Sequence, residues 1–588
     1  MQQWFILGSF IVLVVVIWHH VWHRLVPHYK FLLDNPRGAK FISALLIGII
    51  IHLVLELFHD AHWLTDMEDA GMDFAMQIQA KKGVVQSKEK MLSFVLLDID
   101  NEIHQQILKE PLFTPRDYTR NLIKFATDNG AKVVVVDLDL SRPTLTKEQL
   151  EKLTKEQLEK VKVSEVLTRE QLAKVSGVLT GDPRKLTLHP TLHPDDEELY
   201  KYLNEYKRET CQTPEGKEKK CPLIILARDF KPISDSFQST KDAEKNKERI
   251  QEPRFGFLES AVKNSAPYVQ WASPLFRRSS DGVLRRWGLW VPTCKGTQFD
   301  IIPSIQLLTV AFLCNKEDVK VVESKLKNLE SKFFKDTQQR CEFNNFISPL
   351  VLDKDETDKN AKEEPFCNDD KNLRLTGESK GIYGRILYRM PWKFPDSTTY
   401  KDGIRYDEYS RNDEDNKEHL VLTVANSKAN PSIIKLKDKI VVIGGSYQDG
   451  GDMHETPLNY RVDKEKPSEM PGGLVLINAI NSLWEKGEIN PISPWITWTI
   501  TIGSILAVSS LLAVLKSFLW LLALLLTGFV IMVPFATTWL FDKGQWLSFS
   551  LPLFGVEVHY IIALYEAREG NANVFEDILL RLYRDHKL

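Results

Sequence analysis

The chain has 588 residues, enough for more than one domain, and its 76 Lys and Arg nearly balance 79 Asp and Glu to give a formal net charge of −3. This balance argues against nucleic acid as a partner. The average composition conceals two kinds of sequence, because very apolar runs lie near both ends and a highly charged region separates them.

Five apolar runs predict membrane-spanning helices, because each approaches the roughly 20 residues that a span requires. These runs cover 4–18, 41–58, 495–515, 518–541 and 547–565. Lys and Arg residues between the first two runs place that loop in the cytoplasm. The expected organisation is two spanning helices in 1–58, a periplasmic domain in 59–493, three spanning helices in 495–565 and a cytoplasmic amphipathic tail in 566–588.

Histidines cluster around the first two apolar runs, and His19 and His23 share one helix face. Such a pair could ligate haem or a metal. The accompanying Trp18 and Trp22 favour the alternative, in which the histidines lie in the headgroup region of the bilayer. We therefore expect neither a metal nor a cofactor.

Within 59–493, apolar runs and turn residues predict alternating strands and helices. Expected strands at 92–100 and 133–137 flank an expected helix at 115–126, and a strand, helix and strand of these lengths form a βαβ unit. Further expected elements are strands at 223–226, 382–390 and 440–443 and helices at 63–78, 302–313 and 474–483. The predicted fold class is α/β, with a mostly parallel sheet, plus about five transmembrane helices.

Three charged segments interrupt this pattern and are expected to be insertions: 145–200, 315–380 and 396–430. The first holds three copies of an eight-residue repeat that begin at Thr146, Thr154 and Thr168. Each copy has Gln three residues after its Thr, which is a capping-box pattern. The repeats predict short surface helices that either dock a partner or are solvated decoration.

All six cysteines lie in the charged region, which suits an oxidising compartment. Cys211 and Cys221 enclose a short polar loop and are the first expected disulfide. Cys341 with Cys367 is the second expected pair, and buried free thiols are the alternative.

One stretch near the C-terminal end carries a resemblance to a known family. The expected strand at 440–443 precedes Gly444 and Gly445, and Asp452, a Thr-Pro pair and a helix follow. This order, with three apolar runs after it, resembles the end of the CHASE type 2 sensor domain, an extracytoplasmic input module of bacterial signalling proteins. The turn at Asp281, followed by Arg285, resembles the same family.

The resemblance implies a multi-pass protein of the bacterial inner membrane with a large periplasmic domain. Two features depart from the family pattern. The family has one N-terminal span where this chain has two apolar runs, and no kinase, cyclase or phosphodiesterase sequence follows the last run.

Several carboxylates end the expected parallel strands, at the edge where α/β sheets bind ligands. They could hold a cation or accept hydrogen bonds from a sugar or an amine, although Asp residues at such an edge also cap helices and hold loops. The candidate ligand-binding residues are Asp98, Asp100, Asp137, Asp139, Asp452, Gly444, Gly445 and Arg285. Arg285 is included because it could pair with one of the carboxylates.

These observations favour a membrane-anchored sensor or receptor with a periplasmic binding domain and its output on a separate protein. The alternative is a structural scaffold subunit of a membrane complex. An enzyme is the weakest hypothesis, because the sequence has no P-loop, no H-E-x-x-H and no G-x-S-x-G. Expected partners are the lipid bilayer, a small molecule or cation, and further copies of the chain or other membrane proteins.

Overall fold

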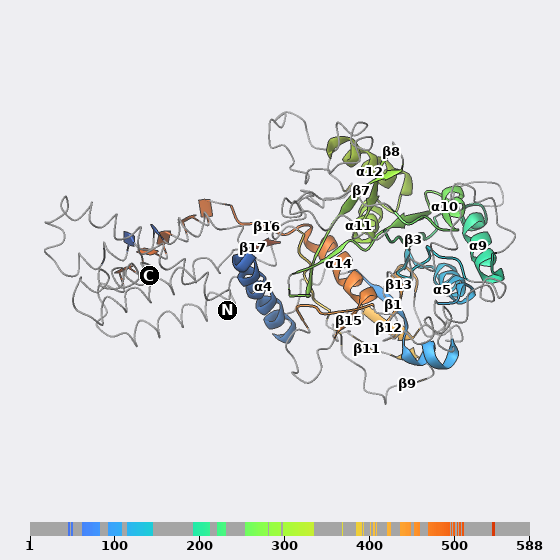
Figure 1. Ribbon diagram of the computed structural model, residues 1–588, viewed down its shortest axis with the longest axis horizontal. Coiled ribbons are helices and arrows are strands. Elements are labelled where there is room, and N and C mark those ends of the chain that lie inside the picture. The colour runs from blue at the N-terminus through green and yellow to red at the C-terminus, as the bar shows by residue number, and fades with distance from the viewer. Residues whose placement is uncertain are drawn as a thin grey trace, which may run out of the picture. The chain divides into compact units, whose positions relative to one another are not determined.

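A computed structural model describes the core of the chain (Figure 1). Its described residues fall mainly in 62–82, 92–108, 114–144, 192–211, 220–230, 253–279, 281–295, 298–333, 384–390, 420–424, 436–447, 452–458, 469–493 and 544–546, with shorter pieces in 41–50, 367, 392, 400–408 and 495–510. The chain divides into two compact units. One unit is Gly83–Glu488, and the other joins Met1–Lys82 to Ile489–Leu588.

The unit Gly83–Glu488 is built on a seven-stranded sheet of order β11-β12-β1-β13-β2-β3-β4. Its strands are β1 (Phe94–Ile99), β2 (Val133–Val136), β3 (Leu223–Ala227), β4 (Val269–Ala272), β11 (Asp407–Glu408), β12 (Leu420–Val424) and β13 (Ile440–Gly445). Every neighbouring pair is parallel except β11–β12. The predicted parallel α/β core is therefore confirmed.

Helices cover both faces of this sheet, which is why the central strands β2 and β3 are apolar throughout. The helical segments are a π-helical turn (Ile103–Ile107), α5 (Arg116–Asp128), α9 (Pro194–Thr210), α10 (Glu259–Asn264), α11 (Ile305–Cys314), α12 (Val319–Phe333) and α14 (Gly472–Lys486). Helices α11 and α14 lie on one side of the sheet and α5 and α9 on the other (Figure 1). The helices expected at 115–126, 302–313 and 474–483 correspond to α5, α11 and α14.

In the part of the chain that the structure describes, four short antiparallel strand pairs lie outside the central sheet. They are β5 (Phe276–Arg278) with β6 (Leu284–Trp287), β7 (Trp290–Lys295) with β8 (Gln298–Pro303), β9 (Tyr400–Lys401) with β10 (Ile404–Arg405), and β14 (Met453–His454) with β15 (Met470–Pro471). The predicted Asp-Gly turn joins β5 to β6, and Gly282 adopts the positive φ of 84° that such a turn requires.

The strand expected at 382–390 is wrong for the residues that the structure describes. Residues 384–390 make only an isolated bridge, between Arg385 and Arg286. The N–H of Ile386 still donates to the carbonyl of Arg285 in β6 (2.8 Å). Beyond it, the N–H of Leu387 donates to Ser482 Oγ (3.0 Å) and that of Met390 to Asn478 Oδ1 (2.9 Å), both in α14. Side chains of α14 therefore take over as hydrogen-bonding partners after Ile386, and the segment does not continue as a strand.

Parts of the expected insertions form regular secondary structure. Within 396–430, the apolar run Leu420–Val424 is β12, which pairs with β1 in the central sheet. Within 315–380, Val319–Phe333 forms the helix α12. Part of 145–200 forms the start of α9, and the three repeats lie outside the described residues.

The second unit contains α4 (His62–Lys82), β16 (Asn490–Pro491) and β17 (Gln545–Trp546). The indole Nε1 of Trp546 donates to Glu68 Oε1 (3.1 Å), so α4 is tied to β17. In the part of the chain that the structure describes, none of the helices combines the length and apolar character that a membrane crossing requires. The five expected spans lie mostly, and the tail 566–588 wholly, outside that part.

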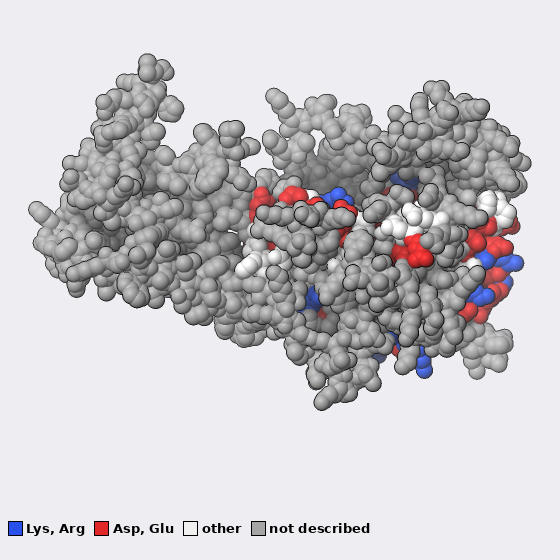
Figure 2. Space-filling model, turned by 90° about the horizontal axis from the view of Figure 1, so that it is seen from below, with Lys and Arg blue, Asp and Glu red and all other residues white. Residues whose placement is uncertain are grey.

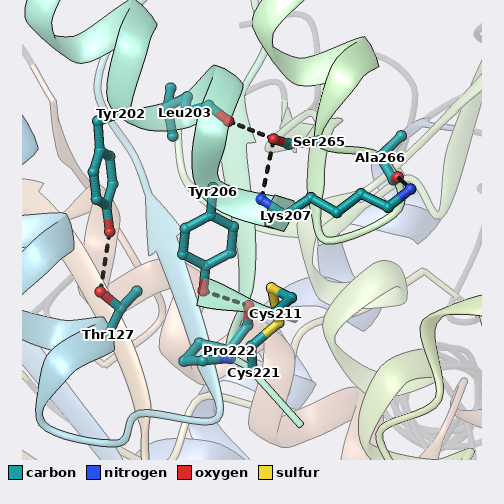
Figure 3. Close-up of a disulfide and its surroundings, with 10 residues drawn as sticks. All are labelled: Thr127, Tyr202, Leu203, Tyr206, Lys207, Cys211, Cys221, Pro222, Ser265 and Ala266. Carbon is teal, nitrogen blue, oxygen red and sulfur yellow. Dashed lines mark hydrogen bonds between the residues drawn. A yellow bond between two sulfur atoms is a disulfide. The ribbon is translucent and has the colours of Figure 1, made fainter. Parts of the chain in front are cut away.

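The expected disulfide Cys211–Cys221 is confirmed, with the two Cα atoms 5.3 Å apart (Figure 3). It joins the end of α9 to the start of β3, beside the hydrogen bond from Tyr206 Oη to the carbonyl of Pro222 (2.9 Å). The second expected pair, Cys341–Cys367, is wrong, because Cys367 bonds to Cys314 at the end of α11.

Replacing Cys211 and Cys221 together by Ser should lower the free energy of unfolding by about 3 kcal/mol, because the bond closes a short loop in the unfolded chain. Replacing Cys314 and Cys367 together should cost more, about 4 kcal/mol, since that loop is longer. Denaturant melts of the two double variants measure both losses. Equal stability of the Cys211/Cys221 variant and the parent would contradict the structural role of this bond.

Candidate functional site

At the carboxyl edge of the sheet, two of the candidate carboxylates lie on either side of the same strand, β13. Asp98 of β1 is in register with Gly444 of β13, and Asp137 follows Val136, the partner of Ile443. Residues in register on parallel strands point to the same face. Asp98 and Asp137 therefore flank Gly444 on one face, at a Cα separation of about 10 Å given the usual strand spacing.

The glycines on this face let α14 approach the sheet closely. A Cβ on Gly444 would lie 3.6 Å from the Cα of Gly473, and a Cβ on Gly473 would lie 2.9 Å from Cδ1 of Leu96. The first turn of α14 thus sits directly against the end of β13. This packing explains why a glycine after the strand, Gly444, and a glycine at the start of the helix, Gly473, occur together.

Asp452 completes the cluster. Its backbone carbonyl accepts a hydrogen bond from the N–H of Gly472 (2.8 Å), and a Cβ on Gly472 would overlap its carboxyl group. Desolvation by the surrounding protein, and then the neighbouring Asp452 carboxylate, raise the pKa of Asp137 well above its ordinary value. Asp137 and Asp452 therefore lie close enough for their charges to interact.

Asp98 is held by the turn that follows β13. Its Oδ2 accepts a hydrogen bond from Ser446 Oγ (2.6 Å), and the N–H of Ser446 donates to the carbonyl of Ile99 (3.0 Å). On the opposite face, the ring of Tyr447 stacks on His104 with centroids 4.1 Å apart, and it covers Gly445, where a Cβ would lie 2.6 Å from the Tyr447 ring. Gly445 is therefore required for ring packing.

Asp100 and Asp139 hold loops, as the alternative interpretation of the strand-edge carboxylates expected. Asp100 Oδ1 accepts from the N–H of Ile103 (2.9 Å) and so caps the helical turn after β1. Asp139 Oδ1 accepts a hydrogen bond from the N–H of Ser141 (2.9 Å). Its Oδ2 lies 3.8 Å from Nε of Arg142 and 3.9 Å from Nη1 of Arg254. These contacts give both carboxylates a local structural role.

The side chain of Arg285 binds Asp281 rather than a strand-edge carboxylate. Its two terminal nitrogens donate to Asp281 Oδ1 and Oδ2 at 2.6 and 2.7 Å, within the β5–β6 hairpin. Burial opposes ionisation of Asp281, but the hydrogen bonds and charge of Arg285 outweigh it and lower the pKa of Asp281. The four-residue spacing of Asp281 and Arg285 across an Asp-Gly turn is the feature of the sequence that could have predicted this pair.

Two side chains at the site were absent from the sequence prediction. His454 Nε2 lies 3.0 Å from Asp452 Oδ1, and Arg278 Nη2 lies 3.1 Å from His454 Nδ1. His454 follows Asp452 by two residues, so the alternation of side chains along an extended segment could have placed them together. Arg278 comes from a distant segment, and no local pattern points to it.

The arrangement does not provide a complete metal site. Among the described residues, no three or more His, Cys, Asp or Glu are grouped so that they could hold a metal ion. The Asp137 carboxylate, in contrast, has no basic partner within the same residues.

Asp137→Asn should stabilise the protein at neutral pH and flatten its pH dependence. Because the pKa of Asp137 is raised in the folded state, that state binds the proton more tightly, and the free energy of unfolding falls as pH rises above the ordinary Asp range. Melting temperatures of the full chain between about pH 4 and pH 8 test this. Asp139→Asn is the control and should not give the gain, while a lower melting temperature of Asp137→Asn at neutral pH would refute the account.

Comparison with known proteins finds a match to the CHASE2 domain over residues 45–526. No curated protein and no solved structure matches the chain. The matched range covers well over half of the sequence and includes the whole parallel sheet, the glycine turn after β13 and α14. The chain therefore belongs to the CHASE2 domain family, a family of sensor domains.

Proposed function

We propose that this protein is a membrane-anchored sensor or receptor that binds a ligand at the carboxyl edge of its central sheet. The sensor role is supported by membership of the CHASE2 family. The single observation that carries the binding role is the crowding of Asp137 and Asp452 between Gly444 and Gly472. Ionisation there is unfavourable without a ligand, so a suitable ligand gains binding energy by relieving it.

The chemistry of the site selects a ligand with positive charge or several hydrogen-bond donors. Carboxylates only accept hydrogen bonds when ionised, and Gly472 in the N-terminal turn of α14 lets the Asp452 carboxyl group lie directly against the helix backbone. An organic amine fits better than a bare metal ion, because the described residues do not form a metal-holding group. A sugar that presents several hydroxyl groups is the neutral counterpart.

A membrane anchor is supported by exposed apolar side chains in the second unit. Trp495 is 83% exposed and Ile502 is 48% exposed, and both lie in the apolar run 495–515. Contiguous exposed side chains of this kind indicate an apolar surrounding such as lipid. With the region 59–493 in the periplasm, the binding edge would face the envelope.

Signalling requires that the ligand bind two states of the protein with different affinity. The edge is suited to this, because it is assembled from segments far apart in the chain: β1, β2, the 452–456 segment and the start of α14. A ligand that bridges these segments favours the arrangement in which they are close. The change can then pass along α14, which ends at Lys486.

A scaffold subunit of a membrane complex is the second candidate, and the surface of α9 favours it. Helix α9 packs beside α5 and α10 on the same side of the sheet, and side chains of both charges gather over it (Figure 2). Such a mixed surface suits solvent or a protein partner. In that case the sensor fold would serve as a support.

The experiment is a thermal-shift titration of the purified full chain with putrescine, Mg²⁺ and glucose, each up to about 10 mM. Binding to the folded state raises stability by about 2.7 kcal/mol at a ligand concentration one hundred times Kd. We expect putrescine to raise the melting temperature of the parent protein. Asp452→Asn should lose the shift, and Asp139→Asn should retain it.

Each outcome of the titration is informative. A shift of equal size in Asp452→Asn and the parent would place the binding elsewhere and overturn the proposal. Absence of any shift in the parent would also overturn it, and a large constant native mass would then favour the scaffold. A shift with Mg²⁺ alone would correct the ligand class from amine to metal ion.

A further inference from the structure

His454 lies between two charged groups and contacts both through its ring nitrogens. Nε2 is 3.0 Å from Asp452 Oδ1, and Nδ1 is 3.1 Å from Nη2 of Arg278. The imidazole is largely buried, with 15% of its side chain exposed. A ring held at both nitrogens has little freedom to rotate, so its contacts define the position of the Asp452 carboxylate.

The partners determine which nitrogen carries the proton. A guanidinium group has donors only, so Nδ1 of His454 must accept from Arg278. Nε2 then carries the hydrogen of the neutral ring and donates it to Asp452 Oδ1. This arrangement is satisfied only by the neutral Nε2–H tautomer, because a hydrogen on Nδ1 would face the Arg278 donor.

The backbone connects the same elements. His454 belongs to β14, which pairs with β15, and Gly472 of α14 follows β15 directly. On the other side, the N–H of Leu284 in β6 donates to the carbonyl of Glu455 (2.8 Å). The segment around His454 is therefore tied both to the first turn of α14 and to the β5–β6 hairpin that carries Arg278.

We propose that His454 is a positioning residue, which holds the Asp452 carboxylate over Gly472 and links the candidate site to the β5–β6 hairpin. When a ligand neutralises Asp452, the hydrogen bond from Nε2 weakens, because charge-assisted bonds are stronger than neutral ones. The contact between Asp452 and His454 then changes in strength, and with it the contact between His454 and Arg278. The hairpin is thus the element that responds first to events at the carboxylates.

This inference rests on the proposed ligand site for its purpose, but the link itself exists without a ligand. Three other charged groups are near enough in the chain or the fold to matter: Glu455, Glu469 and Asp137. Glu455 is bound into the hairpin contact by its backbone, and Glu469 precedes β15. They are the positions to hold constant when the link is tested.

The test is solid-state NMR of the full chain in lipid, with ¹⁵N-labelled histidine rings, at about pH 8, where imidazole is neutral in the absence of strong perturbation. His454→Gln identifies the His454 signals by their loss. We expect the Nε2–H tautomer in the parent and a growing share of the Nδ1–H tautomer in Arg278→Met. His193, whose Nδ1 accepts from the N–H of Asp195, is the control signal and should not change.

Rescue separates positioning from simple packing. Gln offers one donor and one acceptor at a spacing similar to that of the ring nitrogens, so His454→Gln should keep the parent melting temperature and the putrescine shift. His454→Leu fills the space but should lose the shift and several degrees of melting temperature. An Nδ1–H tautomer in the parent, or equal behaviour of the Gln and Leu variants, would overturn the proposal.

The two proposals can fail separately. If the tautomer is as expected but no probe shifts the melting temperature, the ligand proposal fails and the link remains as a structural device. If probes bind and Asp452→Asn abolishes binding while the tautomer differs from expectation, the site stands and the link fails.

Discussion

The structure depends on the close contact between the first turn of α14 and the end of β13. Gly444 and Gly473 face each other, and a Cβ added to Gly444 would be in ordinary van der Waals contact with Gly473. A Cβ added to Gly472 would have no space, because it would overlap the Asp452 carboxyl group. This contact fixes where the helix begins over the sheet, and it holds Asp452 at the helix start through the bond to the N–H of Gly472. The carboxylates of Asp137 and Asp452, which come from separate segments, lie close together because backbones can approach this closely.

The same contact creates an electrostatic imbalance. Asp137 and Asp452 are brought together in a partly desolvated place, while Arg285 of the hairpin is bound to Asp281 and Arg278 contacts His454. A folded protein retains such an arrangement at the expense of stability, and strained sites of this kind concentrate where ligands act. The imbalance therefore connects the geometry of the edge with the sensor role of the CHASE2 family.

Local sequence patterns predicted most of the strands and helices, but they could not predict which strands pair across the sheet. The apolar runs of β1, β2, β3 and β13 were recognisable, but the position of β13 between β1 and β2 depends on pairing across the whole domain. Leu420–Val424 was missed as a strand because charged sequence surrounds a short run. Asp137 and Asp452 followed from the rule for parallel sheets, whereas Arg278 reaches His454 from a segment 176 residues away.

The most direct measurement of the central claim is the titration of the Asp137 carboxyl group by infrared spectroscopy with ¹³C-labelled aspartate. In the parent, a protonated carboxyl band should persist to a pH above the ordinary Asp range, and it should be absent from Asp137→Asn. Removing the neighbouring charge with Asp452→Asn should move that titration to lower pH. An unchanged titration in Asp452→Asn would show that the two carboxylates do not share a site and would contradict the account.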